Sequence, residues 1–279
     1  MVVTGDPRPI GVFDSGIGGL TVAREILRVL PEEKLLYFGD TARVPYGTKS
    51  GETVTRFTLE AAEFLRDFDI KALVVACNTA SAYALTALGE RLQLPVVGVI
   101  ESGARAAARG GEARRVGVIG TAATVASRAY DRALAKIAPQ AEVTSVACPL
   151  FVPLVEEGWL EHPVTRQVAE EYLAPLCERR LDVLILGCTH YPLLRPVLQE
   201  VMGPSVRLVD AGPDTASTVG ELLGAAGRAP STGSPPEHRI FVTDALPAFQ
   251  RTGERFLGRA LPPVEVVRRH EEKWVRALV

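Results

Sequence analysis

Two cysteines in similar sequence surroundings are the residues best suited to chemistry. Cys77 follows the apolar run Leu73-Val-Val-Ala, and Cys188 follows Leu184-Ile-Leu-Gly. Polar residues and a segment of helical spacing come after each, so each cysteine is expected to end a strand and begin a helix. The positive end of a helix lowers the pKa of a thiol, and the thiolate is the reactive form. We therefore predict two activated thiols; burial as small apolar side chains is the structural alternative.

Two thiols on opposite walls of a site suit one kind of proton transfer. Inversion of a carbon centre removes a proton from one face and returns a proton to the other, which two bases can do by exchanging roles. A thiol has a pKa near the pH at which most proteins work, so both protonation states are accessible. Hydroxyl and amide groups that could hold a charged substrate adjoin the cysteines; they belong to Asn78, Thr79 and Thr189.

The segment Asp14–Gly19 follows another predicted strand and begins a helix. Its backbone N–H groups are expected to point toward an anion, with Asp14 and Ser15 nearest the strand end. The segment is not GxGxxG and lacks the Lys-Ser/Thr of a P-loop, so nucleotide binding is poorly supported. A tight turn in which Asp14 or Ser15 caps the helix is the structural alternative.

Three further polar residues are candidates to tune a thiol. His190 lies two residues after Cys188, Glu156 follows a predicted strand, and Asp14 ends one. Each could hydrogen-bond a thiol and change its proton affinity, although a helix cap or a surface position is the simpler interpretation. The other two cysteines, Cys148 and Cys177, are expected to be structural.

The elements that would position these residues are strands alternating with helices. Leu20, Ala23, Leu27 and Leu30 follow one helical stripe. Alternation of this kind predicts an α/β fold with buried parallel sheets whose strand ends carry the site. The expected strands are Ile10–Asp14, Leu35–Asp40, Ala72–Cys77, Val96–Ile100, Val116–Gly120, Val143–Cys148, Asp182–Cys188, Val206–Asp210 and Ile240–Thr243.

A weak internal repeat indicates two similar halves. The run that begins at Ile10 resembles the run that begins at Val116, and the two cysteine segments resemble each other at nearly the same offset. We interpret the repeat as two similar α/β lobes, with chance similarity between apolar strands as the alternative. Near the end, residues 229–237 are rich in Pro, Ser and Gly and are expected to form a linker before a last strand and two amphipathic helices.

Composition narrows the classes of function. The chain has 279 residues and a formal net charge of −2, which gives no electrostatic footprint for nucleic acid or for an anionic membrane. Its four cysteines form no CxxC pair and no zinc-finger spacing, so no metal site is predicted. The polar start, Met1–Pro9, and the lack of an apolar stretch of spanning length predict a cytoplasmic protein whose thiols stay free.

Six motifs resemble those of the glutamate racemase family, within the wider aspartate/glutamate racemase superfamily, over nearly the whole chain. They are DSGIGGLTV (Asp14–Val22), GDTARVPYGTKS (Gly39–Ser50), ACNTAS (Ala76–Ser81), GTAATVASRAY (Gly120–Tyr130), CPLFVPLVEEG (Cys148–Gly158) and GCTHYPLL (Gly187–Leu194).

The resemblance implies two pseudo-symmetric α/β lobes, residues 1–101 with 212–279 and residues 102–211, with the active site in the cleft between them. It implies that Cys77 and Cys188 are the acid/base residues that racemise glutamate without pyridoxal phosphate or metal, providing D-glutamate for peptidoglycan. Asp14, Glu156 and His190 match positions thought to assist proton transfer. Positions that resemble the family's substrate contacts are Asp14, Ser15, Tyr46, Gly47, Asn78, Thr79, Thr121, Thr189 and His190. A homodimer is compatible with the family, whose dimer geometry varies.

Three alternatives stay open. The substrate could be aspartate or another small amino acid, because a sequence does not measure the depth of a pocket. The same scaffold could bind an amino acid without catalysis, although both cysteines are present. A pyridoxal-phosphate racemase would need a Schiff-base lysine, and neither Lys49 nor Lys71 adjoins an evident phosphate-binding loop.

Overall fold

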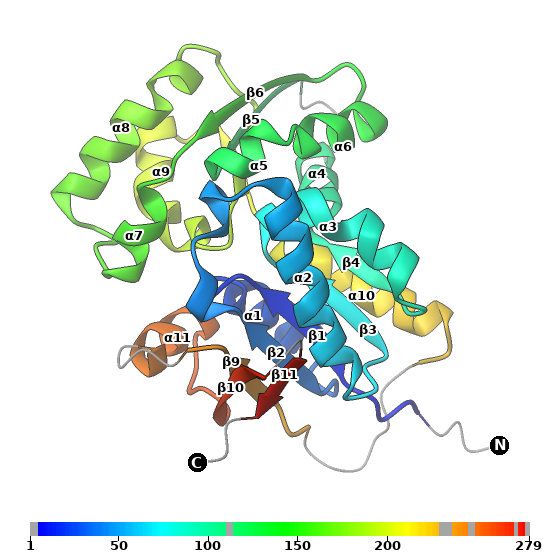
Figure 1. Cartoon of the computed structure of the whole chain (residues 1–279). Coiled ribbons are helices and arrows are strands. Elements are labelled where there is room, and N and C mark those ends of the chain that lie inside the picture. The colour runs from blue at the N-terminus through cyan, green and yellow to red at the C-terminus, as the bar shows by residue number, and fades with distance from the viewer. Residues whose placement is uncertain (1–4, 110–113, 229–235, 245–248, 271–272, 277–279) are drawn as a thin grey trace.

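The computed structural model describes residues 5–109, 114–228, 236–244, 249–270 and 273–276, and these residues form two sheets flanked by helices (Figure 1). We call the seven-stranded sheet with its helices the first lobe and the four-stranded sheet with its helices the second lobe. The strands of the first lobe are β1 (Ile10–Asp14), β2 (Leu35–Gly39), β3 (Ala72–Val75), β4 (Val96–Gly98), β9 (Arg239–Val242), β10 (Val264–His270) and β11 (Lys273–Arg276). The strands of the second lobe are β5 (Arg115–Gly120), β6 (Glu142–Ala147), β7 (Val183–Gly187) and β8 (Arg207–Val209).

Helices connect most of these strands. The α-helices are α1 (Leu20–Val29), α2 (Gly51–Arg66), α3 (Asn78–Arg91), α4 (Val99–Ala108), α5 (Ala122–Ala126), α6 (Ala129–Ile137), α7 (Phe151–Glu156), α8 (Pro163–Cys177), α9 (Arg195–Met202), α10 (Gly212–Ala225) and α11 (Phe249–Leu257). The described part of the chain also has three short 3₁₀ turns, η1 (Thr41–Arg43), η2 (Tyr46–Thr48) and η3 (Tyr191–Leu194).

The two sheets repeat the same strand order. The first contains β2-β1-β3-β4 and the second is β6-β5-β7-β8, with parallel pairing throughout both runs. The strand before Cys77 (β3) and the strand before Cys188 (β7) therefore occupy equivalent places. This order confirms the α/β fold with two similar lobes.

Side chains that alternate along the strands pack against helices on both faces of each sheet. In β1, Ile10 and Val12 pack in one core with residues of α1 and α10, whereas Phe13 packs in another with residues of α2 and α3. In β5, Ile119 and Val118 are likewise divided between two cores. Strands buried on both faces read as continuous apolar runs, which is why the sequence predicted them well.

Two of the expected elements of the first lobe differ from the structure. The expected strand Val96–Ile100 ends at Gly98, because α4 begins at Val99. The expected second C-terminal helix is wrong, because β10 and β11 follow α11 and extend the first sheet beyond β9. The β-branched residues of β10 favour a strand, and tertiary pairing with β9 decides between strand and helix. Most of the predicted linker, residues 229–235, lies outside the described residues.

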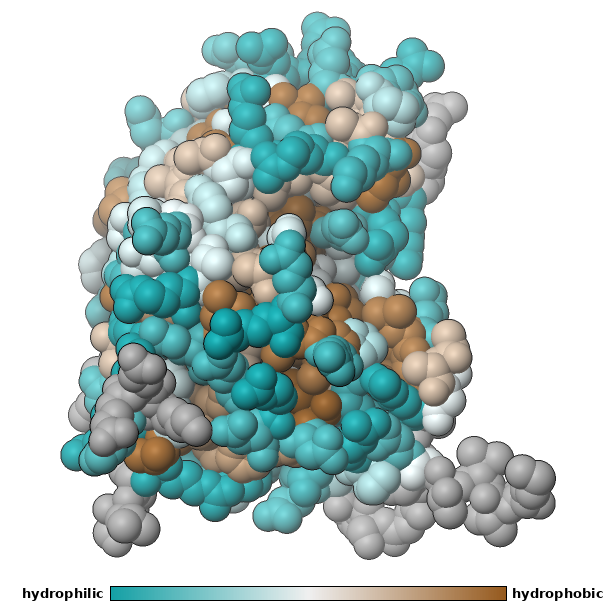
Figure 2. Space-filling model, turned by 45° about the vertical axis from the view of Figure 1, so that its right-hand side comes forward, coloured by the Kyte–Doolittle hydropathy of each residue, from teal (hydrophilic) through white to brown (hydrophobic). Residues whose placement is uncertain are grey.

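The connections between the lobes involve α4 and α10. Helix α4 follows β4 and contacts α6 of the second lobe as well as α10, and α10 also packs against α1. The lobe boundaries near residues 101 and 211 remain a prediction, because these two helices contact each other between the sheets. Figure 2 shows a mainly hydrophilic face in which apolar side chains gather in separate groups. Among the described residues, no helix is long and apolar enough to cross a membrane.

Candidate active site

Cys77 lies where β3 ends and α3 begins. Its Sγ atom lies 3.4 Å from Ser15 Oγ and accepts a hydrogen bond from Ala80 N at 3.5 Å, so Cys77 is the N-cap of α3. Burial raises the pKa of the Cys77 thiol to about 12, and the charges of Asp14 and Cys188 add to the rise. The predicted lowering of the Cys77 pKa by the helix start is therefore wrong for the substrate-free site. Desolvation outweighs the helix and its two hydrogen bonds.

Asp14 places a carboxylate beside this thiol. Its Oδ2 atom accepts a hydrogen bond from Gly16 N at 2.8 Å, whereas its Oδ1 atom is buried without a hydrogen-bond partner among the described residues. Burial raises the pKa of Asp14, against the lowering by hydrogen bonds and by His190. A buried acceptor left open in this way is unusual and can receive a donor from a ligand.

Cys188 lies at the equivalent strand end of the second lobe, with a chain of two polar side chains beside it. Its Sγ atom lies 4.0 Å from His190 Nδ1, and His190 Nε2 lies 2.9 Å from Glu156 Oε1. Burial lowers the pKa of His190, but Cys188 and Glu156 outweigh burial and raise this pKa to about 10. His190 therefore holds a proton within reach of Cys188.

The local backbone at Cys188 differs from the prediction. The helix does not begin at Cys188, because the 3₁₀ turn η3 starts at Tyr191 and α9 starts only at Arg195. Pro192 and Pro196 lie in the first turns of these elements, where a proline is tolerated because its missing N–H would have no partner within the helix. The second cysteine thus lacks the direct helix cap that Cys77 has.

The sites of the two cysteines meet at the interface of the lobes. Thr21 Oγ1 in the first lobe donates to the backbone oxygen of Thr189 at 3.0 Å. A Cβ atom added at Gly18 would overlap Thr189 Oγ1 and lie 2.5 Å from His190 Nδ1, so a larger residue here would force these side chains to shift. The predicted glycine-rich turn therefore packs against the Cys188 segment.

Hydroxyl groups continue this interface on the Cys77 side. Thr79 Oγ1, in α3, lies 2.9 Å from Thr121 Oγ1 and 3.0 Å from Thr124 Oγ1, both in the second lobe. Next to Thr79, Asn78 Oδ1 accepts a hydrogen bond from Tyr130 OH at 2.7 Å. The start of α3 is thus bound to the second lobe directly beside Cys77.

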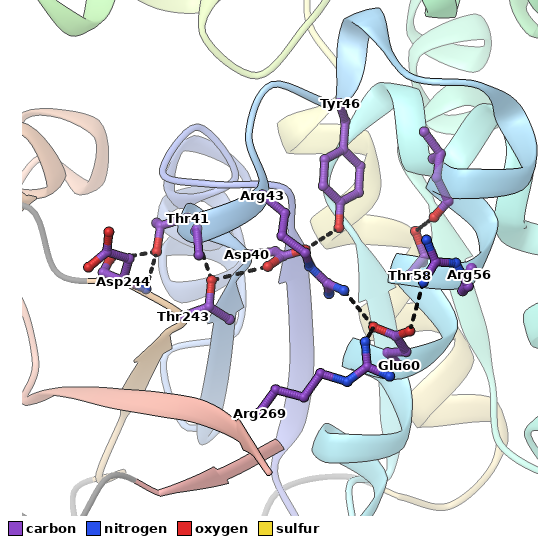
Figure 3. Close-up of polar contacts among 12 residues, drawn as sticks. Asp40, Thr41, Arg43, Tyr46, Arg56, Thr58, Glu60, Thr243, Asp244 and Arg269 are labelled. Carbon is purple, nitrogen blue, oxygen red and sulfur yellow. Dashed lines mark hydrogen bonds and ion pairs between the residues drawn. The ribbon is translucent and has the colours of Figure 1, made fainter. Parts of the chain in front are cut away.

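Tyr46 and Gly47 bring a loop of the first lobe to the same interface. A Cβ atom added at Gly47 would lie 2.6 Å from Thr121 Cβ. The Tyr46 ring is buried, and its hydroxyl donates to Asp40 Oδ2 at 2.5 Å (Figure 3). The loop is therefore anchored in the first lobe at Tyr46 and contacts the second at Gly47.

The structure thus places the predicted site residues at or next to the contact between the lobes. Sequence reasoning missed Asp40, Thr124 and Tyr130 as individual residues. All three lie inside the motifs that were singled out, so polar residues within those motifs were the available signal. Of the other cysteines, Cys148 is buried as expected, whereas Cys177 is exposed. Within the described part of the chain, no three potential metal ligands gather.

The arrangement suits proton exchange at one carbon atom. Two thiols lie at equivalent strand ends of two similar sheets, and each has its own polar support: Ser15 and Asp14 for Cys77, His190 for Cys188. The open Asp14 Oδ1 atom and the hydroxyl cluster offer acceptors and donors for the charged groups of a small molecule. Such a site can remove a proton on one side and return one on the other.

A sequence model described as Asp/Glu/Hydantoin racemase matches residues 10–217, and the chain belongs to this family. Within it, the chain is similar to glutamate racemases. The glutamate racemase of Geobacter metallireducens is 54% identical over 266 residues, which cover 95% of this chain and 98% of the relative.

The chain is also similar to solved structures of glutamate racemases. The glutamate racemase of Francisella tularensis in complex with D-glutamate has a TM-score of 0.89 and 41% identity, covering 94% of this chain and 98% of that one. The glutamate racemase of Thermus thermophilus in complex with β-chloro-D-alanine has a TM-score of 0.84 and 47% identity, with the same coverage.

Proposed function

We propose that this chain is a glutamate racemase that interconverts L- and D-glutamate by moving the α-proton between Cys77 and Cys188. The observation that carries the proposal is the equivalence of the two cysteines. Each is buried and follows the third strand of the same four-strand order. Family membership and 54% identity to a glutamate racemase support the substrate.

In the proposed reaction, the thiolate of one cysteine takes the α-proton and the thiol of the other returns a proton to the opposite face. The electron pair left on the α-carbon is delocalised into the substrate carboxylate, where N–H groups at helix starts stabilise the negative charge. Cys77 is protonated in the substrate-free site, because its pKa is about 12. Cys77 is therefore the acid when the first substrate binds, and the roles exchange in the reverse direction.

Supporting roles follow from the contacts. Asp14 Oδ1, which is open, is proposed to accept a hydrogen bond from the substrate ammonium, whose charge would offset the burial of both Asp14 and Cys77. His190, held by Glu156, is proposed to exchange a proton with Cys188. The remaining proposed substrate contacts are Ser15, Tyr46, Gly47, Asn78, Thr79, Thr121 and Thr189.

The other functions find less support. A pyridoxal-phosphate mechanism needs a free lysine, but Lys71 Nζ is buried and lies 2.6 Å from Glu33 Oε2. Lys49 Nζ donates to the backbone oxygen of Pro45 at 3.1 Å. A binding protein without catalysis would not need two supported thiols. The glutamate racemase relatives favour glutamate over aspartate.

The test is a racemisation assay with matched cysteine variants. Purified protein is incubated with L-glutamate or D-glutamate, and each enantiomer is quantified by chiral chromatography. Cys77→Ala and Cys188→Ala are expected to lose racemisation in both directions. Cys177→Ala, at the exposed end of α8, is expected to match the wild type. Racemisation of aspartate alone would overturn the substrate assignment, and no racemisation of any amino acid would favour the binding protein.

We also propose the cellular setting. As a glutamate racemase, the chain would provide D-glutamate for peptidoglycan in the cytoplasm, where its four free cysteines stay reduced. We further propose a homodimer, an assembly compatible with the family. Sedimentation velocity should then give twice the chain mass of 29.9 kDa, and a species of 29.9 kDa at micromolar concentration would contradict it.

A further inference from the structure

A buried carboxylate anchors the loop that carries Tyr46 and Gly47. Asp40 is fully buried and receives three donors: Tyr46 OH at 2.5 Å and Arg43 Nε at 2.7 Å on Oδ2, and Thr243 Oγ1 at 3.1 Å on Oδ1 (Figure 3). Burial raises the pKa of Asp40, and these three donors act against the rise. Because a buried carboxylate depends on such partners, each donor constrains where the loop lies.

One of the three donors comes from the far end of the chain. Thr243 follows β9, about 200 residues after Asp40. Its hydroxyl donates to Asp40 and accepts a hydrogen bond from Ala42 N at 2.8 Å. Its neighbour Asp244 exchanges two hydrogen bonds with the Thr41 hydroxyl, at 2.6 and 2.8 Å. The end of β9 therefore fixes the first residues of the loop.

Arg43 connects the loop to α2 and β11. Its guanidinium carbon lies 3.8 Å from the centre of the Phe57 ring and 4.9 Å from that of Trp274 in β11. Its Nη1 atom lies 2.5 Å from Glu60 Oε2. These contacts hold Arg43 independently of Thr243, so the loop keeps an anchor when the Thr243 hydroxyl is removed.

The contacts run from the end of β9 to the second lobe. Thr243 and the Tyr46 hydroxyl both donate hydrogen bonds to Asp40. Gly47, the residue after Tyr46, packs against Thr121. Thr121 in turn belongs to the hydroxyl cluster with Thr79 beside Cys77. A shift of the loop would therefore change the contact between the lobes next to Cys77.

We propose that Thr243, acting through Asp40 and Tyr46, is a positioning residue that sets the affinity for substrate. This inference rests on the proposed racemisation of glutamate. Thr243 lies outside the motifs that resemble the family, and it touches none of the reacting groups. Its effect is on the placement of Tyr46 and Gly47 rather than on proton transfer, so it alters KM more than kcat.

The experiment compares two threonines that lose the same hydroxyl. Thr243→Val removes the bond to Asp40, whereas Thr58→Val removes a hydroxyl whose one hydrogen bond among the described residues is to the Val54 oxygen of its own helix, at 2.7 Å. Both threonines are buried and lie in the same region (Figure 3). We expect Thr243→Val to raise KM for both enantiomers about tenfold, the effect of one hydrogen bond to a charged group, with kcat within about twofold. Thr58→Val should leave both constants unchanged, and Thr243→Ser should restore KM.

A double variant tests the route through Tyr46. If Thr243 acts through Asp40 on the Tyr46 hydroxyl, Thr243→Val combined with Tyr46→Phe should raise KM no further than the larger single change. Thermal unfolding of each variant separates loss of folding from loss of positioning. An unchanged KM in Thr243→Val, an equal rise in Thr58→Val, or a fall in kcat alone would overturn the inference. A wild type that does not racemise glutamate would instead overturn the proposed function.

Discussion

His190 Nε2 lies 2.9 Å from Glu156 Oε1, and this contact joins a half-exposed carboxylate to the buried segment of Cys188. The carboxylate helps to keep the pKa of His190 near 10. The imidazole is therefore charged at neutral pH although it is buried. Two groups separated in the sequence by more than thirty residues thus act on one thiol.

Glu156→Gln should lower the pKa of His190, because the amide carries no charge to hold the proton. The alkaline limb of kcat is expected to move to lower pH in both reaction directions. The pH profile of kcat, with NMR titration of the His190 ring, measures the shift. Glu157→Gln, at the exposed neighbouring position, is the control and should leave the profile unchanged. A His190 titration unaffected by Glu156→Gln would contradict the assigned role.

The free energy of unfolding should depend on pH through the same proton on His190. A histidine with a raised pKa in the folded state adds stability that is fully present below its unfolded value of 6.5 and is lost as pH rises toward 10. The free energy of unfolding of the wild type should therefore fall across this range. Glu156→Gln should flatten the decline, as measured by urea unfolding at several pH values. A parallel decline in both proteins would contradict the assignment.

Thiol alkylation should distinguish the cysteines. Cys77 is buried and has a raised pKa, so it is almost wholly protonated at pH 7.5 and should react slowly with iodoacetamide. Cys177 is exposed and should be labelled first. Peptide mapping by mass spectrometry over time measures both rates. Labelling of Cys77 as fast as that of Cys177 would show that the substrate-free thiol is not protonated.

Gly18→Ala should damage the interface between the lobes. The new methyl group would overlap Thr189 Oγ1 and His190 Nδ1, which must shift. Because misplacement by about 1 Å at a catalytic group can cost 100-fold, we expect kcat/KM to fall roughly 100-fold. Gly89→Ala is the matched control, since its methyl group would meet no described residue within 4 Å. That helix position should gain about 0.5–1 kcal/mol in stability and keep full activity.

The buried ion pair of Lys71 and Glu33 should matter for stability and not for catalysis. Lys71 Nζ lies 2.6 Å from Glu33 Oε2 and donates to the backbone oxygens of Asp6 and Arg228. Lys71→Met leaves Glu33 buried without its cation, so the free energy of unfolding should fall by about 3–5 kcal/mol. Urea unfolding measures the loss, and Lys71→Met with Glu33→Leu should recover part of it. A lower kcat at a temperature where the variant is folded would contradict the structural role.

The sequence predicted the strands that are buried on both faces, because continuous apolar runs such as Leu73–Ala76 leave little choice. It also placed Cys77 and Cys188 at equivalent strand ends. It did not predict β10 and β11, because apolar and charged residues are grouped there (VEVVRRH in β10) and do not alternate as in a half-buried strand. Pairing with β9, about 25 residues away, decides the outcome.

The sequence predicted which residues belong to the site better than it predicted their pKa values and their contacts with one another. A helix start lowers the pKa of a cysteine, but the extent of burial at Cys77 depends on both lobes and reverses the effect. The contact of Glu156 with His190 likewise depends on how α7 packs against η3. The support of Tyr46 by Thr243 joins residues almost 200 positions apart and had no local signal.

The most direct test of the two-thiol mechanism is to measure which enantiomer of glutamate carries deuterium at its α-carbon in the first turnovers. L-glutamate is incubated with the protein in D₂O, the enantiomers are separated, and the α-deuterium in each is measured by mass spectrometry. Two thiols predict D-glutamate deuterated from the start while the recovered L-glutamate keeps its proton, because the returning thiol has exchanged with solvent. D-glutamate that retains the original proton would contradict the mechanism, because a single base would then have carried it from one face to the other.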